Sequence, residues 1–313
     1  MPEKIAFLFP GQGSQFVGMG RDIADKFPEV REIFNQLDEV CGKTISNLCF
    51  EGPMEELTIT VNLQPAVTAV NLACLAALSR SGISSSLSAG HSLGEYAALT
   101  SAGVITPYNA LRLVKKRGEL MHREALANPG SMAAVLGMEI EKVSDIVARA
   151  CSNGVLAVAN HNSSQQIVIT GQKESLEYAV DIVEEEGGKA ILLQVSGAWH
   201  CDLMKNAVED FRRFMDDIPF SRPKTTMLFN ATAGAEDKPE KIKDIMARQL
   251  ISPVKWYDIV LRMLDDGVGV FVEVGPKKVL TGLLKKIIPK QSNTKVYNVE
   301  DLKSLESFLE AVK

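Results

Sequence analysis

The chain has 313 residues, 46% of them hydrophobic, which is enough for one large α/β domain or for such a domain with an insertion. Its 34 basic and 39 acidic residues give a formal net charge of −5, and the basic residues are spread along the chain, which argues against nucleic-acid binding. Apolar runs are interpreted as too short for a membrane span, and the run at 5–9 as too short and too early for a signal peptide, so we expect a cytoplasmic protein with no membrane partner.

The five cysteines are odd in number and show no Cys-x-x-Cys spacing, and the four histidines show no ligand spacing either. Such a pattern is typical of reduced thiols and argues against a zinc site. We therefore expect neither a metal nor a redox cofactor.

Residues 5–9 form a continuous apolar run that ends at Pro10-Gly11-Gln12-Gly13. The run predicts a buried parallel strand whose carboxyl end opens into a glycine loop. Ligands in open α/β sheets lie beyond the carboxyl ends of strands, so this loop is a candidate wall of a site. Its glycines do not match the dinucleotide-binding pattern. Helices are predicted next at 29–41 and at 65–78; the second is apolar nearly all round and should be buried, with Pro65 in its first turn.

The segment Gly90-His91-Ser92-Leu93-Gly94 contains Gly-x-Ser-x-Gly, the pattern of a nucleophilic serine on a sharp strand-to-helix turn. Both glycines are required because the two backbones pass close together. A helix from Leu93 to about 102 would direct its free N–H groups at the group that Ser92 attacks, so the Leu93 amide is a candidate oxyanion donor. An ordinary glycine-rich turn is the alternative, and the serine-rich run before it, 83–88, makes a poor buried strand.

Residues 107–127 predict a helix with Thr106 as N-cap. Arg117 lies at the centre of its apolar stripe, where an arginine is costly unless a carboxylate or phosphate meets its guanidinium. One interpretation is a structural salt bridge or an arginine whose charged end reaches the surface. The other is a bidentate clamp for an anionic substrate.

From residue 130 the order of predicted elements is β-α-β-β-α-β, the ferredoxin-like arrangement. We interpret 130–197 as an inserted small domain, and 1–129 with 198–313 as the large α/β-hydrolase-like domain. The predicted elements of the small domain are strands at 131–137, 156–159, 166–170 and 190–195 and helices at 142–150 and 173–185.

His200 lies at the domain junction, before an amphipathic helix, where site residues gather. It is the best-placed histidine to deprotonate Ser92. His91 is expected to face away from the serine, His122 lies on the polar side of its helix, and His161 belongs to the inserted domain. A loop histidine without chemistry is the alternative. Cys201 is a rival nucleophile, but no base or oxyanion turn is visible for it, which favours a packed thiol.

The remaining sequence is α/β in pattern, with strands predicted at 226–229, 268–274 and 295–299 and helices at 239–250, 254–265, 277–288 and 301–312. Four lysines at 277, 278, 285 and 286 are interpreted as a solvated helix face that could also receive an acidic partner.

Several of these segments together resemble the malonyl-CoA:acyl carrier protein transacylases, the family that also supplies polyketide acyltransferases. The resemblance runs from the first strand to about residue 285. It implies the same large α/β-hydrolase-like domain with a ferredoxin-like insertion. The segments that carry it are Phe9-Pro10-Gly11-Gln12-Gly13-Ser14-Gln15, residues 90–96, Lys116-Arg117-Gly118, Asn160-His161-Asn162-Ser163, Gly197-Ala198-Trp199-His200 and Glu273-Val274-Gly275-Pro276.

The resemblance assigns a role to each matching residue. Ser92 matches the acyl-accepting nucleophile and His200 its general base, oriented by a main-chain carbonyl in the segment 249–253, where Ser252 replaces a frequent Asn. Gln12 and Leu93 match the oxyanion-hole amides, and Arg117 matches the arginine that binds the malonyl carboxylate. Substrate contacts are also expected for His91, Asn160, Asn162, Trp199 and Ser252.

Trp199 departs from the Phe or Ser that usually precedes the histidine in this family. A bulky side chain there should crowd a 2-methyl branch, which predicts malonyl over methylmalonyl selectivity. Lys189 lies where the family tends to carry a basic residue suited to a phosphate, a weaker match.

The resemblance implies an acyltransferase that moves malonyl from malonyl-CoA to the phosphopantetheine thiol of acyl carrier protein, an acidic and transient partner, through a malonyl-serine. A monomer is expected. A serine esterase or thioesterase on the same turn, and a non-catalytic carrier-protein docking module, are the alternatives. Arg117 argues against the esterase, because a general esterase does not require a buried cation in its site.

Overall fold

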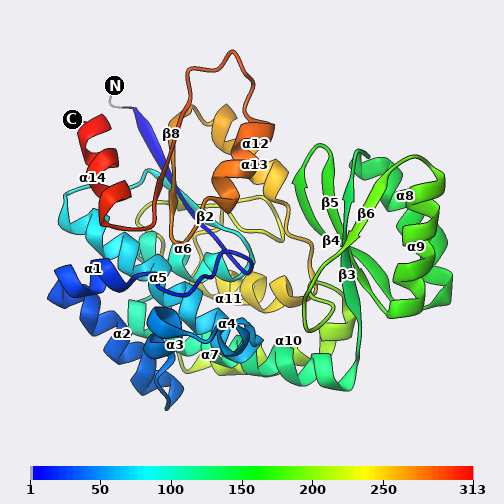
Figure 1. Cartoon of the computed structure of the whole chain (residues 1–313), viewed down its shortest axis with the longest axis horizontal. Helices are drawn as coiled ribbons and strands as arrows, with labels where there is room; N and C mark the ends of the chain where they lie inside the picture. The colour runs from blue at the N-terminus through cyan, green and yellow to red at the C-terminus, as the bar shows by residue number, and fades with distance from the viewer. Residues whose placement is uncertain (1–2, 313) are drawn as a thin grey trace.

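The computed structural model describes residues 3–312, and Figure 1 shows a large body built on one sheet and a smaller body built on a second. The larger sheet has the strand order β7-β2-β1-β8-β9, and all neighbouring strands are parallel. The predicted α/β class with a parallel sheet is confirmed. Its strands are β1 (Lys4–Phe9), β2 (Leu87–Gly90), β7 (Thr226–Met227), β8 (Val268–Val274) and β9 (Lys295–Val299).

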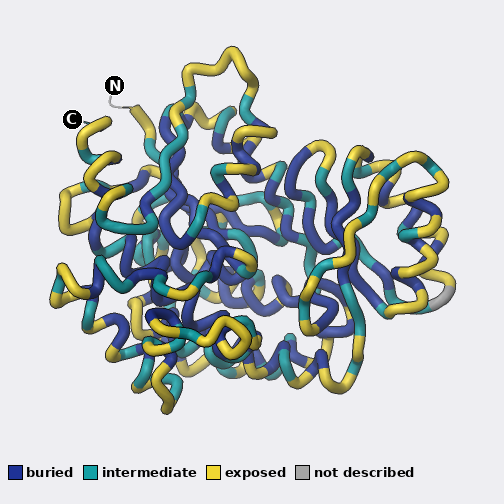
Figure 2. Tube along the Cα trace, in the orientation of Figure 1, coloured by how far each residue is buried: buried dark blue, intermediate teal, exposed yellow. Residues whose placement is uncertain are grey.

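Strand β1 is apolar from Ile5 to Phe9 because both of its faces are covered there. Phe7 and Phe9 pack into the larger core cluster, whereas Ala6 and Leu8 belong to the second cluster, on the other face of the sheet. Figure 2 shows buried residues through the middle of both bodies and exposed residues along the outer helices and loops.

Helices cover both faces of the larger sheet. Those before the small body are α1 (Arg21–Lys26), α2 (Pro28–Cys41), α3 (Ile45–Glu51), α4 (Met54–Thr58), α5 (Thr60–Arg80), α6 (Glu95–Ser101) and α7 (Pro107–Ala127). Those after it are α10 (Lys205–Asp216), α11 (Pro239–Arg248), α12 (Trp256–Asp265), α13 (Val279–Ile287) and α14 (Leu302–Ala311). Short 3₁₀ turns lie at Ser92–Gly94, Cys151–Asn153, Asp202–Met204 and Gln249–Ile251.

Helix α5 corrects two expectations. By length and composition it could cross a membrane, so the expectation that no run reaches that length is wrong; 89% of its apolar window is buried inside the protein, as in a core helix. The helix also begins at Thr60, and Pro65 lies within it. A proline inside a helix removes its own N–H bond and crowds the carbonyl four residues earlier, a cost that burial of the neighbouring apolar Leu63 and Ala66 offsets.

The smaller sheet is antiparallel, in the order β4-β5-β3-β6, the ferredoxin-like arrangement predicted from the sequence. Its elements are β3 (Ser131–Leu136), α8 (Ile140–Ala150), β4 (Leu156–Ser163), β5 (Gln166–Gly171), α9 (Lys173–Glu185) and β6 (Lys189–Leu192). Figure 1 shows α8 and α9 on the side of this sheet away from the large body. The division of the chain at 130 and 197 stays a prediction.

Side chains along β3 alternate between the two faces of the small sheet, and each face packs into a different core. Ala133 and Val135 join the core under α8 and α9, whereas Met132 and Ala134 join the core of the large body. The edge of β4 is also tied to the large body, because Val254 exchanges main-chain hydrogen bonds with Ala159 and His161.

Two predicted helices near the site differ from the structure. The helix after Ser92 begins at Glu95 and not at Leu93, since residues 92–94 form a 3₁₀ turn. The helix predicted at 239–250 ends at Arg248, and Gln249 starts another 3₁₀ turn. Both turns tighten the backbone where it meets the site.

Candidate active site

Ser92 sits on a strained turn between β2 and α6. Its φ is +51°, a left-handed conformation that non-glycine residues adopt rarely and mostly at functional sites. A Cβ at Gly90 would lie 1.9 Å from the carbonyl carbon of Gly94, and one at Gly94 would lie 2.1 Å from the Phe9 oxygen. No side chain fits at either position, so both glycines of the motif are sterically required.

Ser92 and His200 form a hydrogen-bonded pair. The Ser92 Oγ lies 2.9 Å from His200 Nε2, and His200 Nδ1 lies 2.9 Å from the Gln249 carbonyl oxygen and 3.0 Å from that of Ser252. Carbonyl oxygens only accept, so Nδ1 carries the proton and Nε2 is free to accept the serine proton. Burial, and after it the Arg117 charge, lowers the pKa of His200 to about 3, which keeps the ring neutral and able to act as a base near pH 7.

Arg117 is 1% exposed and reaches the nucleophile from the buried face of α7. Its Nη2 donates to Ser92 Oγ at 3.1 Å and, with Nε, to Gln249 Oε1, while Nη1 donates to Gln64 Oε1 at 2.8 Å. All four hydrogen bonds go to neutral oxygens. None of them is the structural salt bridge that the sequence left open as an alternative. The guanidinium is a buried cation turned toward the site.

Two amide side chains that sequence reasoning missed hold the serine turn. Asn230 accepts from the Ser92 N–H at 2.7 Å and donates to the Gly90 carbonyl at 2.7 Å. Gln249 donates from Nε2 to the Ser92 carbonyl at 2.9 Å. Gln64 was missed as well, because it is one of several polar side chains in the largely apolar segment 60–80 and nothing in its spacing distinguishes it from Asn62 or Asn71.

A cavity of about 110 Å³ opens onto these groups. Its walls come from both bodies, with Gln12, His91, Ser92, Leu93, Arg117, Met121, Trp199 and His200 on one side and Met132, Asn160, Leu193 and Val195 on the other. The glycine loop after β1 is thus a wall of the site, as predicted, through Gln12. A small cavity with a nucleophile, a neutral base and a buried cation suits acyl transfer from a short anionic acyl group.

Comparison with known proteins agrees with this geometry. Residues 6–304 match the family described as the acyl transferase domain. This chain belongs to the acyl transferase family.

Its relatives carry more specific names. The malonyl CoA-acyl carrier protein transacylase of Bacillus subtilis (strain 168) is 39% identical over 312 residues, which cover 99% of this chain and 98% of that protein. An acyl carrier protein S-malonyltransferase from Vibrio cholerae has a TM-score of 0.93 at 40% identity and covers 97% of this chain and 99% of its own. A malonyl-transacylase solved in complex with a type II polyketide synthase acyl carrier protein has a TM-score of 0.93 at 38% identity, with 98% and 99% covered.

In this acyl transferase chain, His91 departs from the expected orientation. It was expected to face away from Ser92, but it lines the same cavity and its Nε2 lies 2.8 Å from Asn162 Oδ1. The 3₁₀ turn that begins directly after His91 allows two adjacent residues to face the same cavity. Asn162 itself is absent from the cavity wall and supports His91 from β4.

Two further predicted residues lie outside the cavity. Ser252 contributes its main-chain carbonyl to His200, while its hydroxyl donates to the Arg248 carbonyl at 2.8 Å. Lys189 is exposed at the start of β6.

Cys201 is buried, with a thiol pKa raised by that burial, so it stays protonated and packed. Among residues 3–312, no group of three or more His, Cys, Asp or Glu side chains is placed to hold a metal ion.

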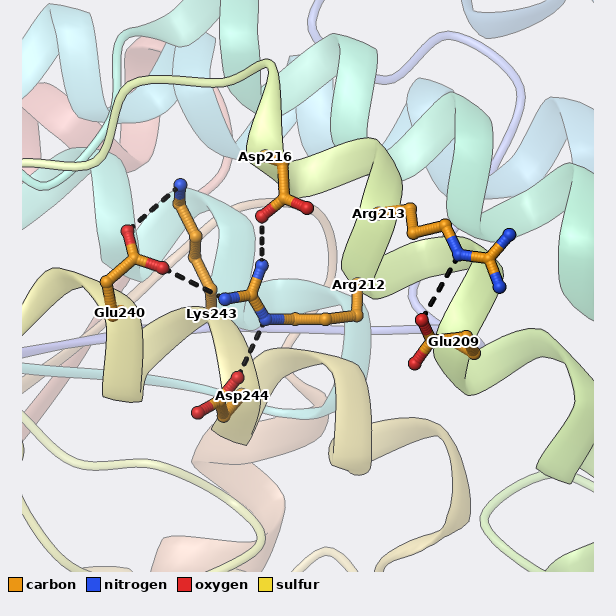
Figure 3. Close-up of polar contacts among 7 residues, drawn as sticks. All are labelled: Glu209, Arg212, Arg213, Asp216, Glu240, Lys243 and Asp244. Atoms are coloured by element: carbon orange, nitrogen blue, oxygen red, sulfur yellow. Dashed lines mark hydrogen bonds and ion pairs between the residues drawn. The ribbon is translucent and has the colours of Figure 1, made fainter.

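The two helices that flank the site residues His200 and Gln249 are joined by an ion-pair cluster (Figure 3). Arg212 on α10 contacts Asp216 on its own helix and reaches Glu240 at 2.9 Å and Asp244 at 2.7 Å on α11. Helix α10 follows His200, and α11 ends directly before Gln249. The cluster therefore fixes the spacing of the two segments that carry the base and its carbonyl partner.

Proposed function

We propose that this chain transfers a malonyl group from malonyl-CoA to the phosphopantetheine thiol of acyl carrier protein, through a malonyl ester on Ser92. The observation that carries the proposal is the position of Arg117, whose Nη2 lies 3.1 Å from the oxygen that would be acylated. In malonyl, two carbon–carbon bonds of about 1.5 Å each separate the carboxylate carbon from the thioester carbon, so a malonyl ester on Ser92 would carry its carboxylate beside this cation.

In the first half-reaction, His200 Nε2 takes the Ser92 proton while Oγ attacks the thioester carbon. The main-chain amides of Gln12 and Leu93, both on the cavity wall, would stabilise the oxyanion. The intermediate collapses, the carbon–sulfur bond breaks, and the CoA sulfur leaves with the proton from His200. Malonyl remains on Ser92.

In the second half-reaction, the carrier thiol gives its proton to His200 and attacks the malonyl ester. The ester bond breaks, and Ser92 recovers the proton from His200. The steps balance without a metal or redox cofactor. Arg117 favours malonyl over uncharged acyl groups, because an uncharged group would occupy the site without forming an ion pair with the buried guanidinium.

The proposal extends to the finer partner and location predictions. We propose a transient complex with an acidic carrier protein, a monomeric enzyme without nucleic-acid or membrane partners, and a cytoplasmic location. The five cysteines are free thiols, which supports a reducing compartment.

Intact-mass measurement tests the function. Wild-type protein incubated briefly with malonyl-CoA should gain one malonyl group, the Ser92→Ala variant should gain none, and holo acyl carrier protein should discharge the adduct faster than water does. Loss of the adduct to water as fast as to the carrier would favour the esterase alternative. Carrier binding without any adduct would favour the docking module.

A further inference from the structure

The acyl-transfer steps proposed above leave the buried carboxylate of Glu95 without a role. Glu95 is the first residue of α6 and is 0% exposed. Its Oε1 accepts from the Asn230 main-chain N–H at 2.7 Å, and its Oε2 accepts from the Gln249 side-chain amide. Both oxygens face donors, an arrangement that stabilises the ionised form.

The two partners of Glu95 are the two amides that hold the site. Asn230 fixes the Ser92 N–H and the Gly90 carbonyl. Gln249 fixes the Ser92 carbonyl and two nitrogens of Arg117 with its side chain, and His200 Nδ1 with its main chain. Glu95 therefore contacts both residues, Asn230 and Gln249, that hold the nucleophile, the base and the cation in place.

Glu95 also supplies a nearby negative charge for Arg117. The hydrogen bonds of the guanidinium go to neutral oxygens. Burial lowers the pKa of Arg117, and Tyr96 and then the Glu95 carboxylate oppose that lowering. A buried guanidinium without any counter-charge would be strongly destabilising. In its ionised form, Glu95 offsets part of this cost across Gln249.

We propose that Glu95 is a positioning residue of this site: its carboxylate orients Asn230 and Gln249, and through them aligns Ser92, His200 and Arg117, and in its ionised form it is a counter-charge of Arg117. This inference depends on the acyl transfer proposed above. Substitution by glutamine tests it, because a glutamine in this place accepts from one partner and turns an N–H₂ group against the other. Gln249 must then rotate its amide, which directs N–H₂ at the guanidinium.

Titration of Glu95 provides a signature that a merely structural role would not produce. Burial raises the pKa of Glu95 to about 8, opposed by Asn230, Gln249 and the Arg117 charge. The other titratable groups around it are His200, His91 and Tyr96. Burial lowers the pKa values of both histidines and raises that of Tyr96, so all three groups are shifted away from the pH range in which Glu95 titrates.

The experiment measures single-turnover release of CoA from malonyl-CoA between pH 6 and pH 9, without carrier protein, so that no carrier thiol titrates. In the wild type the rate should fall as the pH is lowered through the Glu95 pKa. Glu95→Gln should malonylate about 10- to 100-fold more slowly at pH 8 and should lose this dependence. Glu95→Asp should restore part of the rate together with the pH dependence.

Glu273→Gln is the matched control. Glu273 is another carboxylate that is 0% exposed and accepts from two main-chain N–H groups, those of Leu280 and Thr281, away from the cavity. It should keep the wild-type rate and pH profile. If Glu95→Gln malonylates at the wild-type rate with the wild-type pH profile, the inference is wrong while the transfer itself stands. If the wild-type protein forms no malonyl-enzyme, the proposed acyl transfer is wrong, and the inference about Glu95 is wrong with it.

Discussion

Arg117 Nη2 donates a hydrogen bond to Ser92 Oγ at 3.1 Å, so the cation and the nucleophile are in direct contact. An incoming malonyl carboxylate must therefore reach a guanidinium that already touches the oxygen to be acylated. The contact between Arg117 Nη2 and Ser92 Oγ therefore affects both the choice of acyl group and the reactivity of the serine.

Replacing Arg117 by alanine should abolish the preference for malonyl over acetyl. The carboxylate of malonyl would lose its counter-charge in a buried site, which costs about 3–5 kcal/mol, or a factor of roughly 150 to 5,000 in kcat/KM. Acetyl transfer should change far less. Intact-mass rates with malonyl-CoA and acetyl-CoA measure both. Arg112→Ala, on the half-exposed side of the same helix, is the control and should keep the preference; a wild-type preference in Arg117→Ala would contradict the clamp.

The pH dependence of stability should carry the signature of His200. Burial lowers its pKa to about 3 from the ordinary value of 6.5, so the unfolded chain binds this proton more readily than the native one. Stability is therefore lost as pH falls from about 6.5, by up to about 1.4 kcal/mol per pH unit. His200→Asn should lack this contribution, and asparagine tolerates the φ of +63° at this position.

Urea denaturation at several pH values between 7 and 4.5 measures the effect as a difference between wild type and His200→Asn. The variant should gain relative stability as the pH falls. His122→Asn, with a histidine on the half-exposed surface of α7, serves as the control and should follow the wild type. Parallel curves for wild type and His200→Asn would contradict a buried, neutral His200.

The features predictable from sequence are local ones. The Gly-x-Ser-x-Gly turn, the apolar run of β1 and the stripe that buries Arg117 are each encoded within a few residues, so their element types follow from spacing alone. The same holds for the β-α-β-β-α-β order of the small body, whose alternation and helix periods are distinct.

The supports of the site could not be predicted in this way. Asn230 binds Ser92 across 138 residues and Gln249 binds it across 157, and neither belongs to a spacing pattern. The segment holding Gln249 was expected from the family resemblance to present a main-chain carbonyl, but its side chain was not. Which amides meet Ser92 depends on tertiary contacts: β7 pairs with β2 before Asn230, and α11 packs against α10 before Gln249, and such contacts leave no local periodicity.

Trp199 should limit the size of the acyl group. It is 5% exposed, lines the cavity of about 110 Å³, and has no hydrogen-bond partner for Nε1 within residues 3–312. Trp199→Phe removes ring volume without removing a hydrogen bond, so the ratio of kcat/KM for methylmalonyl-CoA to that for malonyl-CoA should rise by about 10-fold or more.

Competition assays with the two thioesters measure that ratio. Trp256→Phe is the matched control, since Trp256 is 0% exposed and is not part of the cavity wall. It should lose stability and keep the wild-type ratio. An unchanged ratio in Trp199→Phe would mean that another wall residue excludes the methyl branch.

Arg212 should stabilise the packing of α10 against α11 more than its neighbour Arg213 stabilises α10. Arg212 is 23% exposed and contacts three carboxylates, two of them on α11, whereas Arg213 is 70% exposed and, within residues 3–312, pairs only with Glu209, one turn earlier on α10 (Figure 3). Exposed pairs contribute about 0.2–1 kcal/mol each, and a shared, partly buried arginine loses less side-chain entropy per pair.

We therefore expect Arg212→Ala to lower the free energy of unfolding by about 1–2 kcal/mol and Arg213→Ala by less than about 0.5 kcal/mol. Urea denaturation at low and at 0.5 M salt separates the two, and equal losses would show that the cluster adds nothing beyond isolated pairs.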